Sequence, residues 1–246
     1  MATRERIDVL LVERGLVESR ARAQARIMAG DVIVDDKRVD KAGEKVPREA
    51  NIRLRGDDMP WVSRGGLKLV GALDAFHVDP QGRTCADVGA STGGFTDVLL
   101  SRGAARVFAI DVGRGQLHEK LRVDPRVVNL EQTHITKMVP ASLAPLPTLA
   151  VVDVSFISLR LVLPAVVVQL APGAEVITLI KPQFEVGKGN VGKGGIVTDV
   201  ALREGAVRDV VAAAQTCGLA LAHDVIASPI TGTDGNVEFL AHFTRQ

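Results

Sequence analysis

The spacing of apolar residues predicts two short helices at the start of the chain. Between residues 6 and 12, aliphatic side chains recur at the spacing of one helical face, and Gly15 is placed to end that helix. Ser19 is a favoured N-cap residue, and the segment that it opens runs to Gly30. Two helices are therefore expected before residue 31.

Extended segments follow these helices. Residues 32–34 and 51–54 have strand-like patterns, and a polar turn stands at residues 35–37. We expect residues 1–58 to form a small α+β domain, which is near the lower size limit for independent folding.

A linker is expected at residues 59–63, where Pro60 interrupts regular structure and Trp61 is placed to anchor the chain on either domain. Residues 64–246 then alternate between strand-like and helix-like segments. Their apolar runs are rich in β-branched residues, which predicts a doubly wound α/β sheet covered on both faces. The expected strands are 84–88, 106–111, 127–130, 149–153, 174–181, 219–227 and 237–243.

The last two expected strands are joined by a short segment, residues 228–235. A parallel crossover needs a longer connection, so these strands should form an antiparallel hairpin. A Rossmann-like sheet with an antiparallel last strand is typical of S-adenosylmethionine-dependent methyltransferases and atypical of nicotinamide-binding enzymes. This is the expected fold class of the larger domain.

Composition excludes several classes of protein. With 46% hydrophobic and 24% charged residues the chain is neither disordered nor collagen-like. Aromatic residues make up only 3%, which argues against a broad base-stacking platform, and the net charge of +1 does not indicate an anionic partner. Neither a signal segment nor an apolar run of membrane-spanning length is present, and Cys85 and Cys217 lack metal-ligand spacing. A cytoplasmic monomer is the expectation.

A glycine turn follows the first strand of the larger domain and opens a helix. Such a turn lets the backbone approach a ligand closely, and ligands of these sheets bind at the carboxyl ends of the strands. A purely structural turn is the alternative. The candidate cofactor-binding residues of this segment are Asp87, Gly89, Ser91, Thr92, Gly93, Gly94 and Phe95.

Asp111 ends the second strand, 24 residues after Asp87, where a carboxylate can accept hydrogen bonds from ribose hydroxyls. The carboxylate of Asp87 would repel a diphosphate but attract the ammonium group of a methionine moiety. The pair therefore favours S-adenosylmethionine over a nicotinamide dinucleotide.

Two other chemistries are disfavoured. Residues 187–194 fit the phosphate-loop pattern Gly-x-x-x-x-Gly-Lys but lack its Ser or Thr and follow the fifth strand, so we interpret them as a mobile basic loop near the substrate. The five histidines form no close ligand pattern, so no metal is expected.

Four charged residues suggest a catalytic group at the same rim. Asp153 and Lys181 end the fourth and fifth strands, Glu238 begins the last strand, and Lys68 lies on a helix entering the domain. Any one of these charged residues alone would more readily have a structural role. Two charged residues at strand ends beside a cofactor-binding turn, with two more from flanking segments, favour a catalytic role.

The first domain resembles the small RNA-binding domain named after ribosomal protein S four. The likeness covers about residues 6–53 and includes Arg-Ile-Asp-x-Leu-Leu, Gly-Leu-Val and Ser-Arg-x-x-Ala in the family's order. It implies that the arginine-rich helix contacts structured RNA through phosphates. The candidate RNA-binding residues, with basic positions of the larger domain added, are Arg6, Arg20, Arg22, Arg26, Arg64, Lys188 and Lys193.

The four charged residues resemble the Lys-Asp-Lys-Glu tetrad of FtsJ-type ribose 2′-O-methyltransferases. Ser-Arg-Gly-Gly-Leu-Lys68-Leu, Val-Asp153, Ile-Lys181-Pro and Val-Glu238-Phe stand in that family's order, and the combination of domains resembles the TlyA family. The resemblance implies methylation of ribosomal RNA in the small subunit, the large subunit or both. A non-catalytic RNA-binding assembly factor and a membrane-active haemolysin are the alternatives.

This resemblance implies a role for each member of the tetrad. Lys181 would take the proton of a ribose hydroxyl, or would stabilise the forming alkoxide if it stays charged. Asp153 would orient Lys181 and touch the cofactor, while Glu238 would position Lys68 or the ribose.

Methylation of a base nitrogen is disfavoured, because Asp-Val-Ser-Phe at 153–156 stands where an Asn/Asp-Pro-Pro-Tyr-type motif would be needed.

Overall fold

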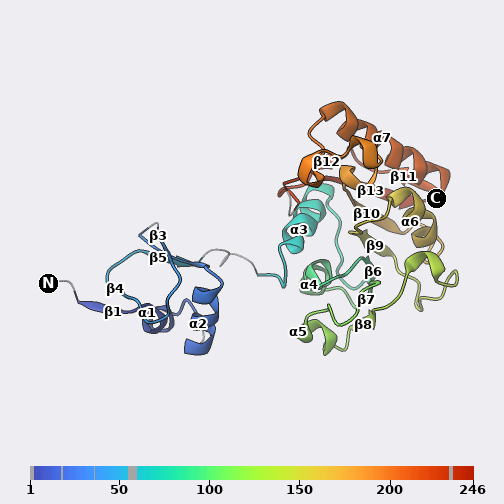
Figure 1. Cartoon of the computed structure of the whole chain (residues 1–246). Coiled ribbons are helices and arrows are strands. Elements are labelled where there is room, and N and C mark those ends of the chain that lie inside the picture. Colours follow the sequence, from blue (N-terminus) through green and yellow to red (C-terminus); the bar gives the residue numbers. More distant parts are fainter. Residues whose placement is uncertain (1–2, 18, 36, 55–59, 233–234) are drawn as a thin grey trace. The chain divides into compact units, whose positions relative to one another are not determined.

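The computed structural model describes residues 3–17, 19–35, 37–54, 60–232 and 235–246. The chain divides into two compact units, Met1–Pro60 and Trp61–Gln246 (Figure 1). The expected domain boundary after residue 58 lies outside the described residues.

The first unit packs two helices against short antiparallel strands, as the apolar pattern predicts. Helix α1 (Ile7–Glu13) and helix α2 (Arg20–Met28) confirm the expected helices, and Ser19 Oγ caps α2 by accepting a hydrogen bond from the backbone N–H of Arg22. A three-stranded sheet has the order β3-β2-β5, and a separate pair joins β1 to β4. These strands are β1 (Arg4–Arg6), β2 (Val32–Val34), β3 (Lys37–Val39), β4 (Lys45–Pro47) and β5 (Ile52–Leu54).

Two of these strands are not predicted by the apolar pattern. β1 and β4 are three residues long and mostly polar, so they carry too little alternation to stand out. Lys37, expected in a turn, begins β3 and pairs with Val34. The apolar faces of both helices meet the sheet in one core that includes Ile7, Leu11 and Ile27.

The second unit is a mixed α/β sheet in the order β11-β13-β10-β9-β6-β7-β8, with β12 paired to β13. The central strands are parallel, and β13 runs antiparallel to β10, which confirms the expected reversed last strand. The strands are β6 (Thr84–Val88), β7 (Arg106–Ile110), β8 (Val127–Leu130), β9 (Leu149–Val152), β10 (Glu175–Ile180), β11 (Leu219–Leu221), β12 (Ile226–Ala227) and β13 (Phe239–Arg245).

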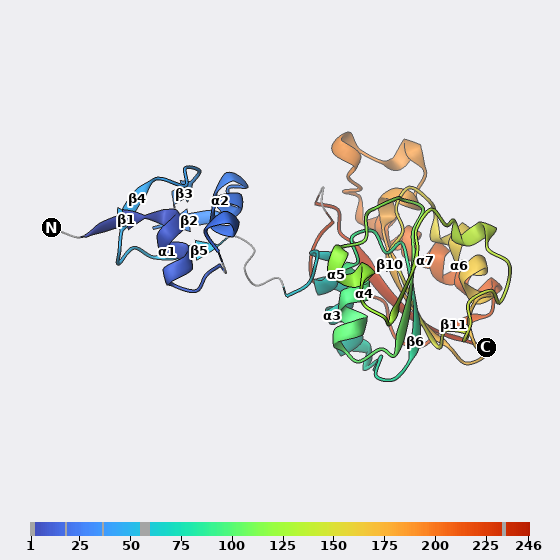
Figure 2. The same ribbon diagram turned by 90° about the horizontal axis from the view of Figure 1, so that it is seen from below.

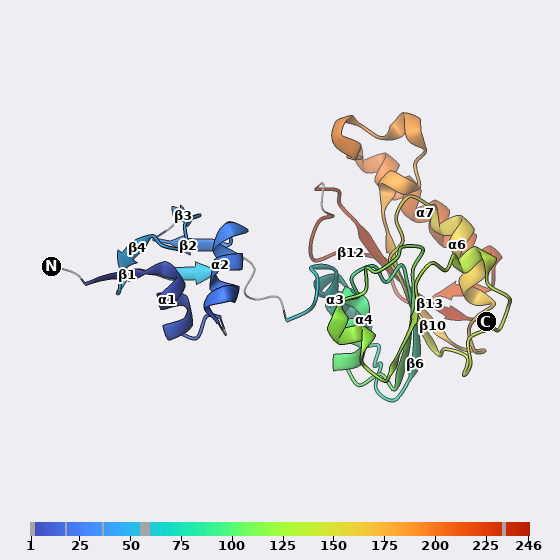
Figure 3. The same cartoon turned by 60° about the horizontal axis from the view of Figure 1, so that its bottom comes forward.

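Helices cover both faces of this sheet. Figures 2 and 3 show α3, α4 and α5 on one side and α6 and α7 on the other. Side-chain alternation explains the two layers: along β9, Leu149 and Val151 join the core under α3 and α4, while Ala150 and Val152 join the core under α6 and α7. The helices are α3 (Gly65–Phe76), α4 (Gly94–Ser101), α5 (Glu119–Arg122), α6 (Leu159–Val167) and α7 (Val200–Thr216), with short 3₁₀ turns η1 (Ile135–Lys137), η2 (Pro182–Phe184), η3 (Lys188–Asn190) and η4 (Lys193–Gly195).

The end of the chain differs from the expected hairpin in two details. The segment expected as one strand at 219–227 is divided into β11 and β12. Leu221 pairs with Phe243 and Ile226 pairs with Leu240. The chain therefore advances five residues from Leu221 to Ile226 while β13 advances only three, and the extra residues form a bulge between β11 and β12. The last strand begins at Phe239, so Glu238 immediately precedes it.

The segment expected as a linker makes contacts with the second unit. Trp61 lies over Gly66 of α3, where an added Cβ would stand 2.5 Å from Trp61 Cγ. The backbone N–H of Val62 donates to Asp97 Oδ2 at 2.9 Å. Trp61 and Val62 are therefore fixed on α3 and α4 of the second unit.

Candidate active site

Four predicted site residues come together at one rim of the sheet. Asp87 lies near the end of β6, and the first residues after β7, β9 and β10 are Asp111, Asp153 and Lys181. Because these four strands are parallel neighbours, their carboxyl ends meet at the same edge.

The glycine turn after β6 fits against the loop that follows β9. Gly89 has a φ of +88°, and a Cβ added there would stand 2.2 Å from the carbonyl oxygen of Asp153. Gly93, with a φ of +96°, is the N-cap of α4. The turn therefore requires glycine both for its backbone conformation and for its close approach to a neighbouring loop.

Asp87 is fully buried at the base of this turn. Thr96 Oγ1 donates to Asp87 Oδ2 at 2.6 Å, whereas Oδ1 meets no donor among the residues that the structure describes. Burial raises the pKa of Asp87 to about 7, against the opposing hydrogen bond from Thr96. An orphaned, buried carboxylate oxygen favours a cationic N–H donor from a ligand.

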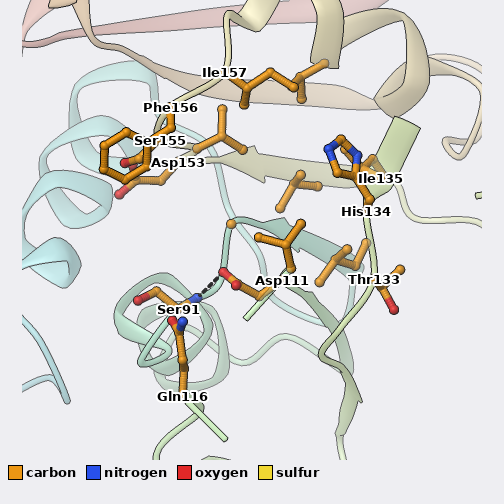
Figure 4. A pocket seen from close by; sticks show the side chains of 16 residues that line it. Ser91, Asp111, Gln116, Thr133, His134, Ile135, Asp153, Ser155, Phe156 and Ile157 are labelled. Atoms are coloured by element: carbon orange, nitrogen blue, oxygen red, sulfur yellow. Dashed lines mark hydrogen bonds between the residues drawn. The ribbon is translucent and has the colours of Figure 1, made fainter. Parts of the chain in front are cut away.

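Asp111 holds the adjoining loops through both oxygens. Its Oδ2 accepts from the backbone N–H of Ser91 at 2.8 Å (Figure 4), and its Oδ1 accepts from the backbone N–H of Gly113 at 2.7 Å. Each carboxylate oxygen retains a further lone pair that can accept a hydrogen bond from a hydroxyl group.

A cavity of about 610 Å³ opens over these residues, a size suited to a cofactor. In Figure 4, Asp153, Ser155 and Phe156 lie on one side of it and His134 and Ile135 on the other. Its lining comprises Val88, Gly89, Ser91, Ile110, Asp111, Val112, Gln116, Thr133, His134, Ile135, Asp153, Val154, Ser155, Phe156, Ile157 and Val162.

Not every predicted cofactor residue lines this cavity. Gly89, Ser91, Asp111 and Asp153 do, whereas Phe95 is buried in the core beneath α3 and α4. The turn residues Thr92, Gly93 and Gly94 and the buried Asp87 also lie outside the lining. The sequence analysis did not predict Gln116, Thr133 and His134. They lie in loops that follow strands, and such loops line the ligand sites of these sheets, so that rule would have indicated them.

The four charged residues form two ion pairs, in which Lys68, Lys181 and Glu238 are buried and Asp153 is partly exposed. Lys181 Nζ lies 2.5 Å from Asp153 Oδ1, and Lys68 Nζ lies 2.6 Å from Glu238 Oε2. A second cavity, of about 360 Å³, is lined by Lys68, Lys181 and Glu238. Both lysines are about one-tenth exposed, so their charges are compensated within the protein.

Ser155 and Phe156 line both cavities, which therefore adjoin. Lys181 Nζ donates to Ser155 Oγ at 2.9 Å. Phe156 has a φ of +65° and is 92% exposed, and its ring centroid lies 5.2 Å from that of Phe184. Neither residue was predicted, since a polar or aromatic residue in a loop has no periodic signal.

The comparisons with known proteins decide the family. Residues 61–245, which carry both cavities, match the FtsJ-like methyltransferase family, and residues 5–52 match the S4 domain. The chain belongs to the FtsJ-like methyltransferase family. It is an S-adenosylmethionine-dependent methyltransferase, as the reversed last strand and the Asp87 turn predict.

Relatives of this methyltransferase match over nearly its whole length. It is 49% identical over 242 residues to the 16S/23S rRNA (cytidine-2′-O)-methyltransferase TlyA of Mycobacterium tuberculosis, covering 97% of this chain and 89% of that one. It is 41% identical over 239 residues to hemolysin A of Brachyspira hyodysenteriae, covering 97% and 99%. A solved hemolysin-like protein from Streptococcus thermophilus has a TM-score of 0.77 and 43% identity, covering 100% and 90%. These matches confirm the expected resemblance to the TlyA family.

The residues present fit the methyl donor. Asp87 offers a buried acceptor without a partner in the described structure, Gly89 leaves no room for a side chain, and Asp111 keeps acceptor capacity toward the cavity. This donor set suits a ligand that carries an ammonium group and a ribose. Across the described residues, no group of three or more His, Cys, Asp or Glu side chains is placed to bind a metal ion.

In the first unit of the methyltransferase, several predicted RNA-binding arginines have protein partners. Arg6 and Arg20 both bond to the buried Asp8 at 2.9 Å, and Arg26 pairs with Asp31 at 3.1 Å. The two arginines hold the pKa of Asp8 well below its usual range, Arg6 through the largest contribution. These arginines are therefore oriented by the fold as well as available at its surface.

The remaining basic candidates are exposed. Arg22 lies on the outer side of α2, and Arg64 directly precedes α3. Lys188 and Lys193 stand in the loop that also contains Val191 and Gly195, two residues of the second cavity's lining. They place positive charge beside that cavity.

Proposed function

We propose that this methyltransferase transfers the methyl group of S-adenosylmethionine to the 2′-hydroxyl of a ribose in ribosomal RNA. The observation that carries the proposal is a pair of lysine–carboxylate contacts lining a small cavity that meets the larger one at Ser155 and Phe156. One cavity suits the cofactor and the other suits the nucleotide.

The larger cavity would hold the cofactor through residues already described. Asp87, buried outside the cavity's lining, would accept a hydrogen bond from the methionine ammonium, directly or through water, and Asp111 in the lining would accept hydrogen bonds from the ribose hydroxyls. Ser91 and Gly89 would bring backbone close to the ligand, and Asp153 would stand where the two cavities approach each other. When bound, S-adenosylmethionine supplies an electrophilic methyl group on a sulfonium.

Lys181 would meet the reacting hydroxyl. It either accepts the hydroxyl proton as a neutral amine or, as an ammonium, stabilises the forming alkoxide while the hydroxyl proton passes to solvent water. Asp153, 2.5 Å away, orients the amine in both cases. Most of the acceleration would come from placing the oxygen in line with the methyl group.

Lys68 and Glu238 would position the nucleotide rather than move its proton. They line only the smaller cavity, and their ion pair is closed within the protein. The ammonium of Lys68 is suited to a ribose or phosphate oxygen, and Glu238 keeps it in place.

The substrate would be folded RNA of the ribosome. The Mycobacterium tuberculosis relative is named for cytidine in 16S and 23S rRNA, so we propose a cytidine in one or both subunits. The first unit, with Arg6, Arg20, Arg22 and Arg26, would contact phosphates together with Arg64, Lys188 and Lys193. We propose that the enzyme works as a monomer in the cytoplasm.

The test is transfer of labelled methyl from S-adenosylmethionine to purified, unmodified ribosomal subunits. We expect label on ribose with the wild type and none with Lys181→Ala, while Arg208→Ala on the exposed face of α7 should behave as wild type. Absence of label despite measurable RNA binding would favour a non-catalytic assembly factor.

The haemolysin alternative has a separate test. Within the described part of the chain, no helix has the length and apolarity to cross a bilayer. We therefore expect no leakage from lipid vesicles at protein concentrations that saturate RNA binding. Leakage that survives in Lys181→Ala would establish a second activity.

A further inference from the structure

Ser155 stands at the point where the two cavities meet and touches the central lysine of the site. We propose that Ser155 is a positioning residue that fixes the direction in which Lys181 presents its amine to the ribose hydroxyl. The inference rests on the proposed function, because it concerns the same reaction.

The ammonium group of Lys181 carries three N–H donors. Ser155 Oγ accepts a hydrogen bond from Nζ at 2.9 Å, whereas Asp153 Oδ1 lies 2.5 Å from Nζ as an ion-pair partner and accepts no hydrogen bond among the described residues. The hydrogen bond to Ser155 therefore fixes rotation about the last bond of Lys181 and leaves other N–H directions for a ligand. Asp153 alone would attract the amine without fixing that rotation.

The loop that carries Ser155 is held by hydrogen bonds at its far end. Directly after Ser155, Phe156 adopts a φ of +65°, a conformation that a bulky residue rarely takes. At the far end, Glu185 accepts hydrogen bonds from Ser158 Oγ at 2.6 Å and from the backbone N–H of Leu159 at 2.8 Å.

Glu185 belongs to the loop that begins at Lys181, so the two loops are joined twice. The inner connection is Lys181 with Asp153 and Ser155, and the outer connection is Glu185 with Ser158. Ser155 therefore sits in a preorganised turn and has little freedom to give up when the substrate binds.

The experiment compares Ser155→Ala with Ser155→Thr, which keeps the hydroxyl. For Ser155→Ala we expect kcat to fall about 10- to 100-fold, a loss typical of small misplacement of a reacting group. Its affinity for S-adenosylmethionine by calorimetry should stay that of wild type. Ser155→Thr should recover most of the rate.

Three results would overturn the proposal: a Ser155→Ala rate within twofold of wild type, a Ser155→Thr rate no better than that of Ser155→Ala, or a rate loss matched by an equal loss of cofactor affinity. Wild type and Lys181→Ala accompany each assay. If wild type leaves no label on ribose, the proposed function fails. If wild type is active and Lys181→Ala is not, an unaffected Ser155→Ala contradicts the role of Ser155 alone.

Discussion

The two lysine–carboxylate pairs of the site have similar lengths but different origins. Lys181 and Asp153 are the first residues after β10 and β9, which pair in parallel, so the register of the sheet brings them together. Lys68 and Glu238 are 170 residues apart and come from α3 and from the segment before β13. One pair follows from local topology, whereas the other depends on complete folding of the unit.

The surroundings of the pairs differ as well. Asp153 lines the larger cavity while its partner Lys181 lines the smaller one, so this pair spans the junction. Lys68 and Glu238 both line the smaller cavity. We propose proton chemistry for the pair at the junction and nucleotide placement for the other pair, and each proposal predicts a different failure.

The largest expected effect separates the pairs by kinetics. Lys181→Met should lower kcat about 10²- to 10⁴-fold, the usual range for losing a proton-transfer group, because Lys68, the other amine of the smaller cavity, pairs with Glu238 rather than with a residue of the larger cavity. Lys68→Met should act mainly by raising KM for RNA. Steady-state methyl transfer at several RNA concentrations measures both, and equal effects on kcat would contradict the assignment.

The next effect is on stability. Lys68→Met leaves the carboxylate of Glu238, which is 3% exposed, without its cation, and breaking such a buried pair costs about 3–5 kcal/mol. Replacing both residues by Met should recover most of the loss. Trp61, the sole tryptophan, packs on the second unit and reports its unfolding by fluorescence.

The same substitution at the junction provides the comparison. The side chain of Asp153 is 19% exposed, so Lys181→Met should destabilise the second unit less than Lys68→Met does. A larger loss for Lys181→Met would mean that the junction pair, rather than the remote one, holds the unit together.

Asp87 extends the comparison to the cofactor side and predicts a pH dependence. Because burial raises its pKa from 3.8 to about 7, the carboxyl group of the cofactor-free protein is protonated below that pH. Binding an ammonium group there requires the carboxylate, so affinity for S-adenosylmethionine should fall up to tenfold per pH unit below about 7. Calorimetry across this range measures it, and Asp87→Asn should flatten the profile.

The same shift predicts how stability changes with pH. Between the unfolded pKa of 3.8 and the folded pKa of about 7, the folded protein holds a proton that the unfolded chain has lost. The contribution of Asp87 to stability is therefore greatest at the acid end and declines as pH rises to about 7. Asp87→Asn should remove this decline in urea titrations without cofactor, and a steeper decline in the variant would contradict the assignment.

Much of this site can be predicted from the strand pattern, and there is a physical reason why the other residues cannot. Apolar strands that end in Asp111, Asp153 and Lys181 predict which side chains share a rim, because parallel strands end together. Ser155 and Phe156 are placed by a turn with a positive φ, which no periodicity reveals. Similarly, the exposed arginine pattern of α2 does not show that Asp8 is buried beneath it.

The smallest expected effect concerns Asp8 of the first unit. Its carboxylate has two arginine partners, whereas Asp153 and Glu238 each have one lysine partner. Asp8 bonds to Arg6 and Arg20, and Gln24 adds a contact at 3.4 Å. Arg20→Gln therefore leaves the buried charge compensated by Arg6. Since the side chain of Arg20 is 57% exposed, the loss should be about 1 kcal/mol or less, read by amide hydrogen exchange in α2.

RNA binding by the same variant tests whether Arg20 contacts phosphate in addition to Asp8. Loss of one phosphate contact should weaken binding alike for all sequences and reduce the slope of log affinity against log salt by about 1. An unchanged slope would confine Arg20 to holding α1 against α2. A stability loss as large as that of Lys68→Met would show that the second arginine gives no protection, and the contrast between singly and doubly paired carboxylates would then fail.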